Sequence, residues 1–155
     1  MRPLSSSWLV SGLALAAALW LCACVHTTPA ALPEGFAAYP PDGAFKAVTA
    51  DGVVYRVRRE PNQPYADMAF WKEAMKKRML EAGYRLGAEG PLAAGPRQGY
   101  LLELSAPYGP QDYGYLIAIF VEKESIQIAE AAGEVTTLAK HRPALLAAMA
   151  GLTPP

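Results

Sequence analysis

The segment YGYLIAIFV, from Tyr113 to Val121, carries apolar side chains at nearly every position. A half-exposed strand alternates apolar and polar residues, because one of its faces meets water. A strand that is apolar on both faces is typical of the middle of a sheet. We therefore expect a central strand that is covered on one side by helices.

Turn signals divide the neighbouring chain into further strands. The dipeptide Asp51-Gly52 favours the positive backbone angles of a tight hairpin turn, and it separates two short strands in AFKAVTADGVVYRVRRE. A strand at 84–88 is followed by the Gly- and Pro-rich segment EGPLAAGPRQG, which predicts a loop, and then by YLLELSA and the central segment. SIQIAEA completes a hairpin after residues 122–124.

Two segments have the apolar spacing of a helix. In ADMAFWKEAMKKRMLEAGY, Asp67 is a candidate amino-terminal cap and Gly83 a stop, so this helix should end at Ala82. In EVTTLAKHRPALLAAMAG, Pro143 lacks an amide hydrogen and clashes with the preceding turn, which predicts a break or a sharp kink near residues 141–142. The apolar residues of the first helix are Met68, Trp71, Met75 and Met79.

The predicted order is β-β-α-β-β-β-β-α, an α+β fold with an antiparallel sheet of about six strands and two helices mainly against one face. Over about Ala44 to Leu152 the chain resembles the PsbP, Mog1 and DcrB-like group of small α/β sandwiches. The resemblance rests on this order, the FW pair of the first helix, the GY pair after it and the closing helix. It implies a non-catalytic accessory or binding role, and it supplies no catalytic residue.

The amino terminus has the order of a secretory signal peptide. Arg2 supplies one positive charge, and the uncharged run WLVSGLALAAALWL comes after it. The apolar run from Trp8 to Val25 falls slightly short of the roughly 20 residues that a membrane-spanning helix needs. This run alone is compatible with a plain signal peptide or with an uncleaved anchor.

The end of this run, Leu21-Cys22-Ala23-Cys24, resembles the bacterial lipobox. The resemblance implies a signal peptide over residues 1–23, cleavage between Ala23 and Cys24, and lipidation of Cys24. Acyl chains then anchor the protein in the membrane, at about 0.8 kcal/mol for each buried methylene. Val25 rather than Asp after the cysteine resembles sorting to the outer membrane, so we expect the protein in the bacterial cell envelope, facing the periplasm.

Composition excludes several classes of site. The chain has two cysteines, and Cys-x-Cys lacks the second ligand pair that a zinc site needs. The formal net charge is zero and no long basic block is present, which argues against nucleic-acid binding. We expect no metal and no cofactor.

Residues 24–43, which come after the signal peptide, are rich in proline and predict a semi-extended tether. Residues 44–155 then form a single α+β domain.

The strongest candidate binding residues are tyrosines in and around SAPYGPQDYGY. Tyrosine combines a large apolar area with a hydrogen-bonding tip, which makes it an effective anchor for a partner when it is exposed. The alternative is that these residues cap an edge of the sheet. The candidates are Tyr100, Tyr108, Tyr113 and Tyr115.

Two other groups could carry chemistry. Glu103 and Glu130 could face each other across the sheet and raise each other's pKa; the preferred alternative is a solvated outer face, or a pairing of these carboxylates with Arg56 or Arg58. His141 is the only histidine of the domain and could act as a base.

These features give three hypotheses about function. The preferred one is a non-enzymatic envelope lipoprotein that docks onto a protein of an envelope complex through the tyrosine loop or the uncovered sheet face. The second is a small-molecule or lipid-binding module with a pocket between sheet and helices, lined by Trp71, Phe120 and nearby methionines. The third is a hydrolase centred on His141.

Overall fold

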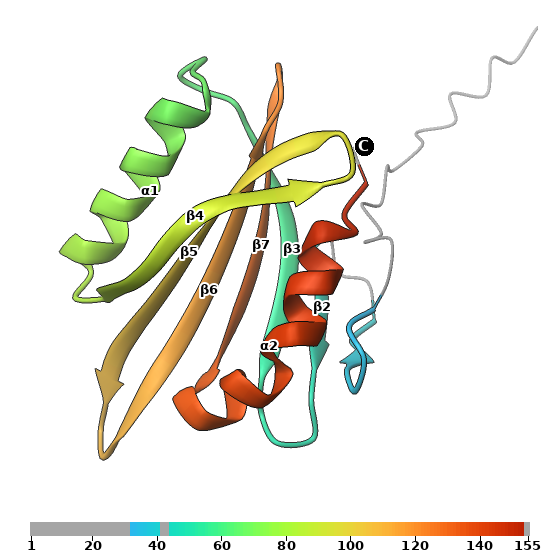
Figure 1. Cartoon of the computed structure of the whole chain (residues 1–155), viewed down its shortest axis with the longest axis vertical. Coiled ribbons are helices and arrows are strands. Elements are labelled where there is room, and N and C mark those ends of the chain that lie inside the picture. Colours follow the sequence, from blue (N-terminus) through green and yellow to red (C-terminus); the bar gives the residue numbers. More distant parts are fainter. Residues whose placement is uncertain (1–31, 41–43, 154–155) are drawn as a thin grey trace, which may run out of the picture.

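The computed structural model describes residues 32–40 and 44–153 (Figure 1). The predicted signal peptide, Cys24 and the first part of the tether lie outside the described residues. In chain order the elements are β1 (Ala37–Ala38), β2 (Phe45–Val48), β3 (Val54–Pro61), α1 (Met68–Glu81), β4 (Arg85–Ala94), β5 (Arg97–Tyr108), β6 (Gln111–Val121), β7 (Ser125–Glu134) and α2 (Val135–Ala150).

The strands form one antiparallel sheet in the order β1-β2-β3-β7-β6-β5-β4, which confirms the α+β class. The sheet has seven strands rather than about six. The additional strand, β1, lies within the range predicted as tether and pairs with β2, and Phe36 before it is buried against Tyr55. The folded part of the chain therefore includes residues that precede Ala44.

β6 lies in the interior of the sheet, as its sequence predicts, next to the middle strand β7. It pairs with β5 on one side and β7 on the other, and residues 116–120 are each exposed by 3% or less. Leu116 and Phe120 point to the face that carries α2, whereas Ile117 and Ile119 point to the face that carries α1. Burial on both faces is what the continuous apolar pattern requires.

The helices lie on opposite faces of the sheet, so the prediction that both cover mainly one face is wrong. Leu138, Leu145 and Met149 of α2 belong to the same buried cluster as Phe120. The Met and Trp stripe of α1 packs against the other cluster, which contains Ile119. The physical reason is that β6 exposes apolar side chains on both faces, and each face needs its own cover.

Local signals place the ends of α1 well. The Asp67 carboxylate accepts a hydrogen bond from the Phe70 amide at 3.0 Å, and the chain leaves the helix through Ala82 and Gly83, whose φ is 91°. These are the predicted cap and stop.

The second helix, α2, runs without a break from Val135 to Ala150 although it contains Pro143. The predicted interruption is therefore wrong, but Figure 1 shows the helix axis bending partway along, which agrees with the kink that was the alternative. Its first turn is capped by the Glu134 carboxylate, which accepts hydrogen bonds from the Thr136 and Thr137 amides.

The predicted loop EGPLAAGPRQG is instead a hairpin. β4 continues to Ala94, and β5 begins at Arg97 after a turn at Gly95, whose φ is 57°. Because β4 is an edge strand, Pro91 is accommodated within it; an edge strand does not need every amide to donate within the sheet. A composition rich in Gly and Pro is thus compatible with a strand when that strand lies at the edge.

Gly99 of β5 makes room for the Phe120 ring. A Cβ at Gly99 would lie 2.4 Å from a ring carbon of Phe120, whereas a Cβ at Gly90 on the adjacent strand would meet nothing within 4 Å. We expect Gly99→Ala to lower the free energy of unfolding by about 1–3 kcal/mol, and Gly90→Ala to change it by less than about 0.5 kcal/mol. Urea unfolding of both variants measures this; equal stabilities would show that Phe120 relaxes without cost.

Candidate functional site

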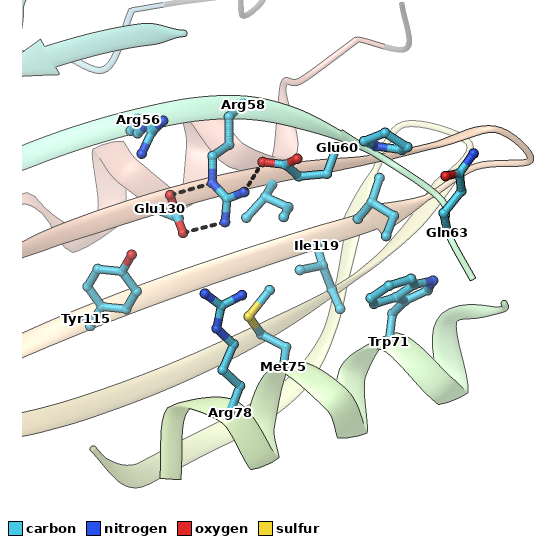
Figure 2. A pocket seen from close by; sticks show the side chains of 13 residues that line it. Arg56, Arg58, Glu60, Gln63, Trp71, Met75, Arg78, Tyr115, Ile119 and Glu130 are labelled. Carbon is cyan, nitrogen blue, oxygen red and sulfur yellow. Dashed lines mark hydrogen bonds and ion pairs between the residues drawn. The ribbon is translucent and has the colours of Figure 1, made fainter. Parts of the chain in front are cut away.

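A groove runs beside α1 on its face of the sheet. The helix lies over β4, β5 and β6, and the charged side chains of Arg58 and Glu130, on β3 and β7, line a cavity beside it. This cavity has a volume of about 740 Å³. Figure 2 shows α1 along one side of it and β3 along the other.

The groove has an apolar floor and charged walls. Ile119, Ile126 and Ile128 from the sheet and Trp71 and Met75 from α1 form the apolar part. Polar side chains rise from β3, from β6 and β7, and from the last turn of α1. They are Arg56, Arg58, Glu60, Tyr115, Glu130 and Arg78.

An ion pair organises the middle of the charged wall. Arg58 donates from Nε and Nη2 to the two carboxylate oxygens of Glu130, at 3.1 and 3.2 Å, and from Nη1 to Glu60. Burial, followed by the nearby charge of Glu130, raises the pKa of the Tyr115 hydroxyl, which therefore stays protonated. A pairing of Glu103 or Glu130 with Arg56 or Arg58 was one of the alternatives drawn from the sequence, and it is confirmed for Glu130 and Arg58.

The groove carries surplus positive charge. Within the described residues, the Arg56 and Arg78 side chains have no hydrogen bond or ion pair, while Glu60 and Glu130 both bind Arg58. Three guanidinium groups and two carboxylates leave one net positive charge, and two guanidinium groups are available to a bound molecule. Guanidinium groups recognise carboxylates and phosphates through paired hydrogen bonds.

A buried asparagine positions the tryptophan at the end of the groove. Asn62 is 4% exposed, and its Oδ1 accepts from the Trp71 indole Nε1 at 2.7 Å and from the Ala66 amide at 3.2 Å. Its Nδ2 donates to the carbonyls of Ala66 and Glu122, at 3.0 and 2.9 Å. Asn62 therefore ties the loop before α1 to the β6–β7 turn. Neither its residue type nor its spacing singles it out in the sequence.

The tyrosine candidates divide into two places. Tyr113 and Tyr115 line a second cavity of about 400 Å³ together with Tyr84, whose ring centroid is 5.6 Å from that of Tyr115. Tyr115 lines both cavities, so they adjoin along the same face. Tyr100 pairs with Ile119, six residues along β6 from Tyr113, which corresponds to about 20 Å.

Tyr100 and Tyr108 do not join this pair in the described structure. The Lys72 ammonium lies 5.0 Å from the centroid of the Tyr100 ring, so Tyr100 contacts the side of α1 rather than the hairpin. Tyr108 belongs to β5 at the β5–β6 hairpin, and its side chain lies outside the described part of the structure. The structure therefore brings Tyr113 and Tyr115 together and separates them from Tyr100.

The predicted pair of carboxylates does not form. Glu103 points to the α2 face, where it accepts hydrogen bonds from the Arg142 guanidinium, and Glu130 points to the α1 face. Successive residues of a strand alternate between faces, and the register of β5, β6 and β7 places these two on opposite sides.

His141 contacts a turn rather than a nucleophile. Its Nε2 lies 3.0 and 3.1 Å from the two carboxylate oxygens of Asp51, and its ring packs edge-on against Phe36 with centroids 5.6 Å apart. A hydrogen bond from the Thr49 hydroxyl, followed by that from His141, lowers the pKa of Asp51. This contact fastens α2 to the β2–β3 turn.

The second hypothesis named Trp71 and Phe120 as lining one pocket. Trp71 lies in the groove, but Phe120 is buried on the opposite face beneath the Arg97 guanidinium.

Within residues 32–40 and 44–153, no cluster of three or more His, Cys, Asp or Glu could hold a metal ion. No helix in the same ranges is long and apolar enough to cross a membrane.

Comparisons with known proteins found solved structures of similar fold but no family. No protein-family model matches the sequence, and no curated protein matches it significantly. The structure is similar to PA94 of Pseudomonas aeruginosa, a protein of unknown function, with a TM-score of 0.60 and 14% identity over 77% of this chain and 97% of that one. It is also similar to LpqN of Mycobacterium tuberculosis, described as involved in cell envelope biogenesis, with a TM-score of 0.59 and 11% identity over 74% of this chain and 75% of that one.

The Asn62 network yields a stability prediction. Asn62→Leu leaves the Trp71 indole and the Glu122 carbonyl without their partner, so we expect a loss of about 2–4 kcal/mol in the free energy of unfolding. Trp71→Phe removes only the indole donor and part of the ring, and should cost less. Chemical unfolding of both variants, with tryptophan fluorescence reporting the site in Asn62→Leu, measures the difference. A larger loss in Trp71→Phe would contradict the role given to Asn62.

Proposed function

We propose that the protein is a non-enzymatic, lipid-anchored accessory protein of the bacterial cell envelope that docks onto a protein partner through the groove beside α1. The observation that carries the proposal is the composition of this groove. Arg, Trp, Tyr and Met are enriched at the centres of protein interfaces, and Arg56, Arg78, Trp71, Tyr115 and Met75 all line it.

The form of the groove also favours a protein partner. An apolar floor bordered by charged side chains has the anatomy of an interface core with a polar rim. Two guanidinium groups without partners in the described structure would meet carboxylates on the partner. The adjoining cavity at Tyr113 and Tyr115 extends the surface along the same face.

The cellular location is supported by two independent observations. The sequence Leu21-Cys22-Ala23-Cys24 resembles a lipobox, and LpqN, which has a similar fold, is described as involved in cell envelope biogenesis. Anchoring through Cys24 in the outer membrane, facing the periplasm, is the location that we propose. The resemblance to the PsbP, Mog1 and DcrB-like group supports the non-catalytic role.

A second candidate function is the binding of a small anionic molecule with an apolar body. A cavity of about 740 Å³ lies within the range of small-molecule sites, which is about 300–1,000 Å³. Such a molecule would place its anionic group at Arg56 and Arg78 and its apolar part on the isoleucines.

Charge reversal in the groove tests the docking function. We expect the double variant Arg56→Glu and Arg78→Glu to lower recovery of a cross-linked partner from native membranes at least 10-fold, because it replaces two cations with two anions. Lys77→Glu and Lys140→Glu, which reverse the same charge at exposed positions outside the groove, form the control.

The outcome separates the candidates. Equal recovery from the groove variant and the control would contradict docking through this groove. Loss of a small added mass in native mass spectrometry, with no change in any cross-linked protein, would support the second candidate function instead.

Membrane attachment has its own test with a matched control. Cys24→Ser removes the thiol that would carry the lipid, so we expect the protein to leave the membrane fraction, whereas Cys22→Ser keeps the small residue that the lipobox requires and should leave attachment unchanged. Fractionation and intact-mass measurement check both. Membrane retention of Cys24→Ser at the mass of the unlipidated chain would contradict the anchor.

A further inference from the structure

A cluster of buried polar groups without partners lies on the α2 face, on the opposite side of the sheet from the groove. Arg59 of β3 and Gln127 of β7 are directly opposite each other in the register of the two strands. Gln127 is only 1% exposed, yet neither its Oε1 nor its Nε2 has a hydrogen-bond partner in the described part of the chain. The Nε and Nη2 atoms of Arg59 are also buried and unpartnered there.

This arrangement is costly unless something occupies it. A buried donor or acceptor without a partner costs about 1–3 kcal/mol, and a charged group costs more. The Gln127 amide and the Arg59 guanidinium each have two unpartnered atoms among the described residues. The two side chains lie on the same face of neighbouring strands. Side chains buried in this way are normally satisfied by water or by an ion.

The charges nearby distinguish an ion from water. Arg97 of β5 reaches the same end of the sheet, where its Nη2 lies 2.8 Å from Glu122 Oε1, its Nη1 donates to the Leu152 carbonyl at 3.1 Å, and its guanidinium carbon lies 4.6 Å from the Phe120 ring centroid. Gln127, which pairs with Arg59 in β3, pairs with Phe120 in β6, and the Arg97 guanidinium lies over the Phe120 ring, so the register places Arg97 beside the cluster. Burial, with the charge of Arg59 as a further cause, lowers the pKa of Arg97.

The cluster therefore contains two cations and one carboxylate. Glu122 can neutralise one guanidinium group, and one positive charge remains on Arg59, which is half-buried and whose Nε and Nη2 atoms are shielded from solvent. Water can accept hydrogen bonds from Arg59, but it cannot offset that charge.

We propose that a small monovalent anion of the chloride class binds between Arg59 and Gln127, beside Arg97. The Nε and Nη2 groups of Arg59 and the Nε2 group of Gln127 supply its hydrogen bonds, and its charge balances the cluster. The site is independent of the proposed docking groove: it lies on the other face of the sheet and shares no residue with that groove.

Anion-dependent stability tests the site. Because a ligand that binds only the folded state stabilises it, the melting temperature of the full-length protein should be about 3 °C higher in sodium chloride than in sodium gluconate at equal ionic strength. Gluconate is too large to reach donors that are themselves buried, so it controls for screening. The increase should saturate as chloride replaces gluconate.

Matched variants assign the effect to the cluster. Arg59→Met keeps an aliphatic stem but removes the donors, and should abolish the difference between the two salts. Arg85→Met makes the same change at an exposed position of β4, outside both this cluster and the groove, and should preserve it. Equal melting temperatures of the wild-type protein in both salts, or an undiminished chloride effect in Arg59→Met, would overturn the proposal.

A direct measurement covers the case in which Arg59→Met does not fold. Crystals of the wild-type protein soaked in sodium bromide should give an anomalous peak within hydrogen-bond distance of Arg59 and Gln127. Density at that position without an anomalous signal would identify water there and would overturn the proposal.

Discussion

Burial of β6 and β7 on both faces is the constraint on which the other features depend. Ile117, Ile119 and Ile128 need cover on one face, while Phe120 and Ala129 need it on the other. A single layer of helices cannot supply both, so the chain places one helix on each face. One helix is narrower than a seven-stranded sheet, and a cavity lined by side chains of β3 and β7 lies beside it. The groove is thus a consequence of covering a wide sheet with one helix.

Local signals predicted the elements, and long-range register determined the rest. The cap at Asp67, the stop at Gly83 and the turn at Asp51-Gly52 act within a few residues, and the structure has all three where the sequence predicts them. The side of the sheet that each helix covers depends on the path of the whole chain, so the apolar stripes could not predict it. The loop prediction for EGPLAAGPRQG failed for a related reason: its edge position, which permits proline, is a property of the assembled sheet.

The candidate site was only partly accessible to sequence reasoning. Trp71 and Tyr115 stand out by residue type and do line cavities, whereas the separation of Glu103 from Glu130 results from strand register, which residue types do not reveal. Buried polar residues were the group missed altogether. Asn62 and Gln127 resemble surface residues in the sequence, and only the structure shows one held by four hydrogen-bonding groups and the other buried without a partner among the described residues.

The edge strands of the sheet, β1 and β4, are poor sites for pairing with a strand of another chain. β1 has two residues, and β4 carries an irregular register between Leu86 and Ala88 as well as Pro91. A short strand at one end and an interrupted one at the other are poor templates for adding a further strand. Sheet extension, whether by a copy of this chain or by an extended peptide, is therefore disfavoured at both borders. A partner would therefore contact the side chains on the faces of the sheet. The backbone hydrogen-bonding groups at its edges would not take part.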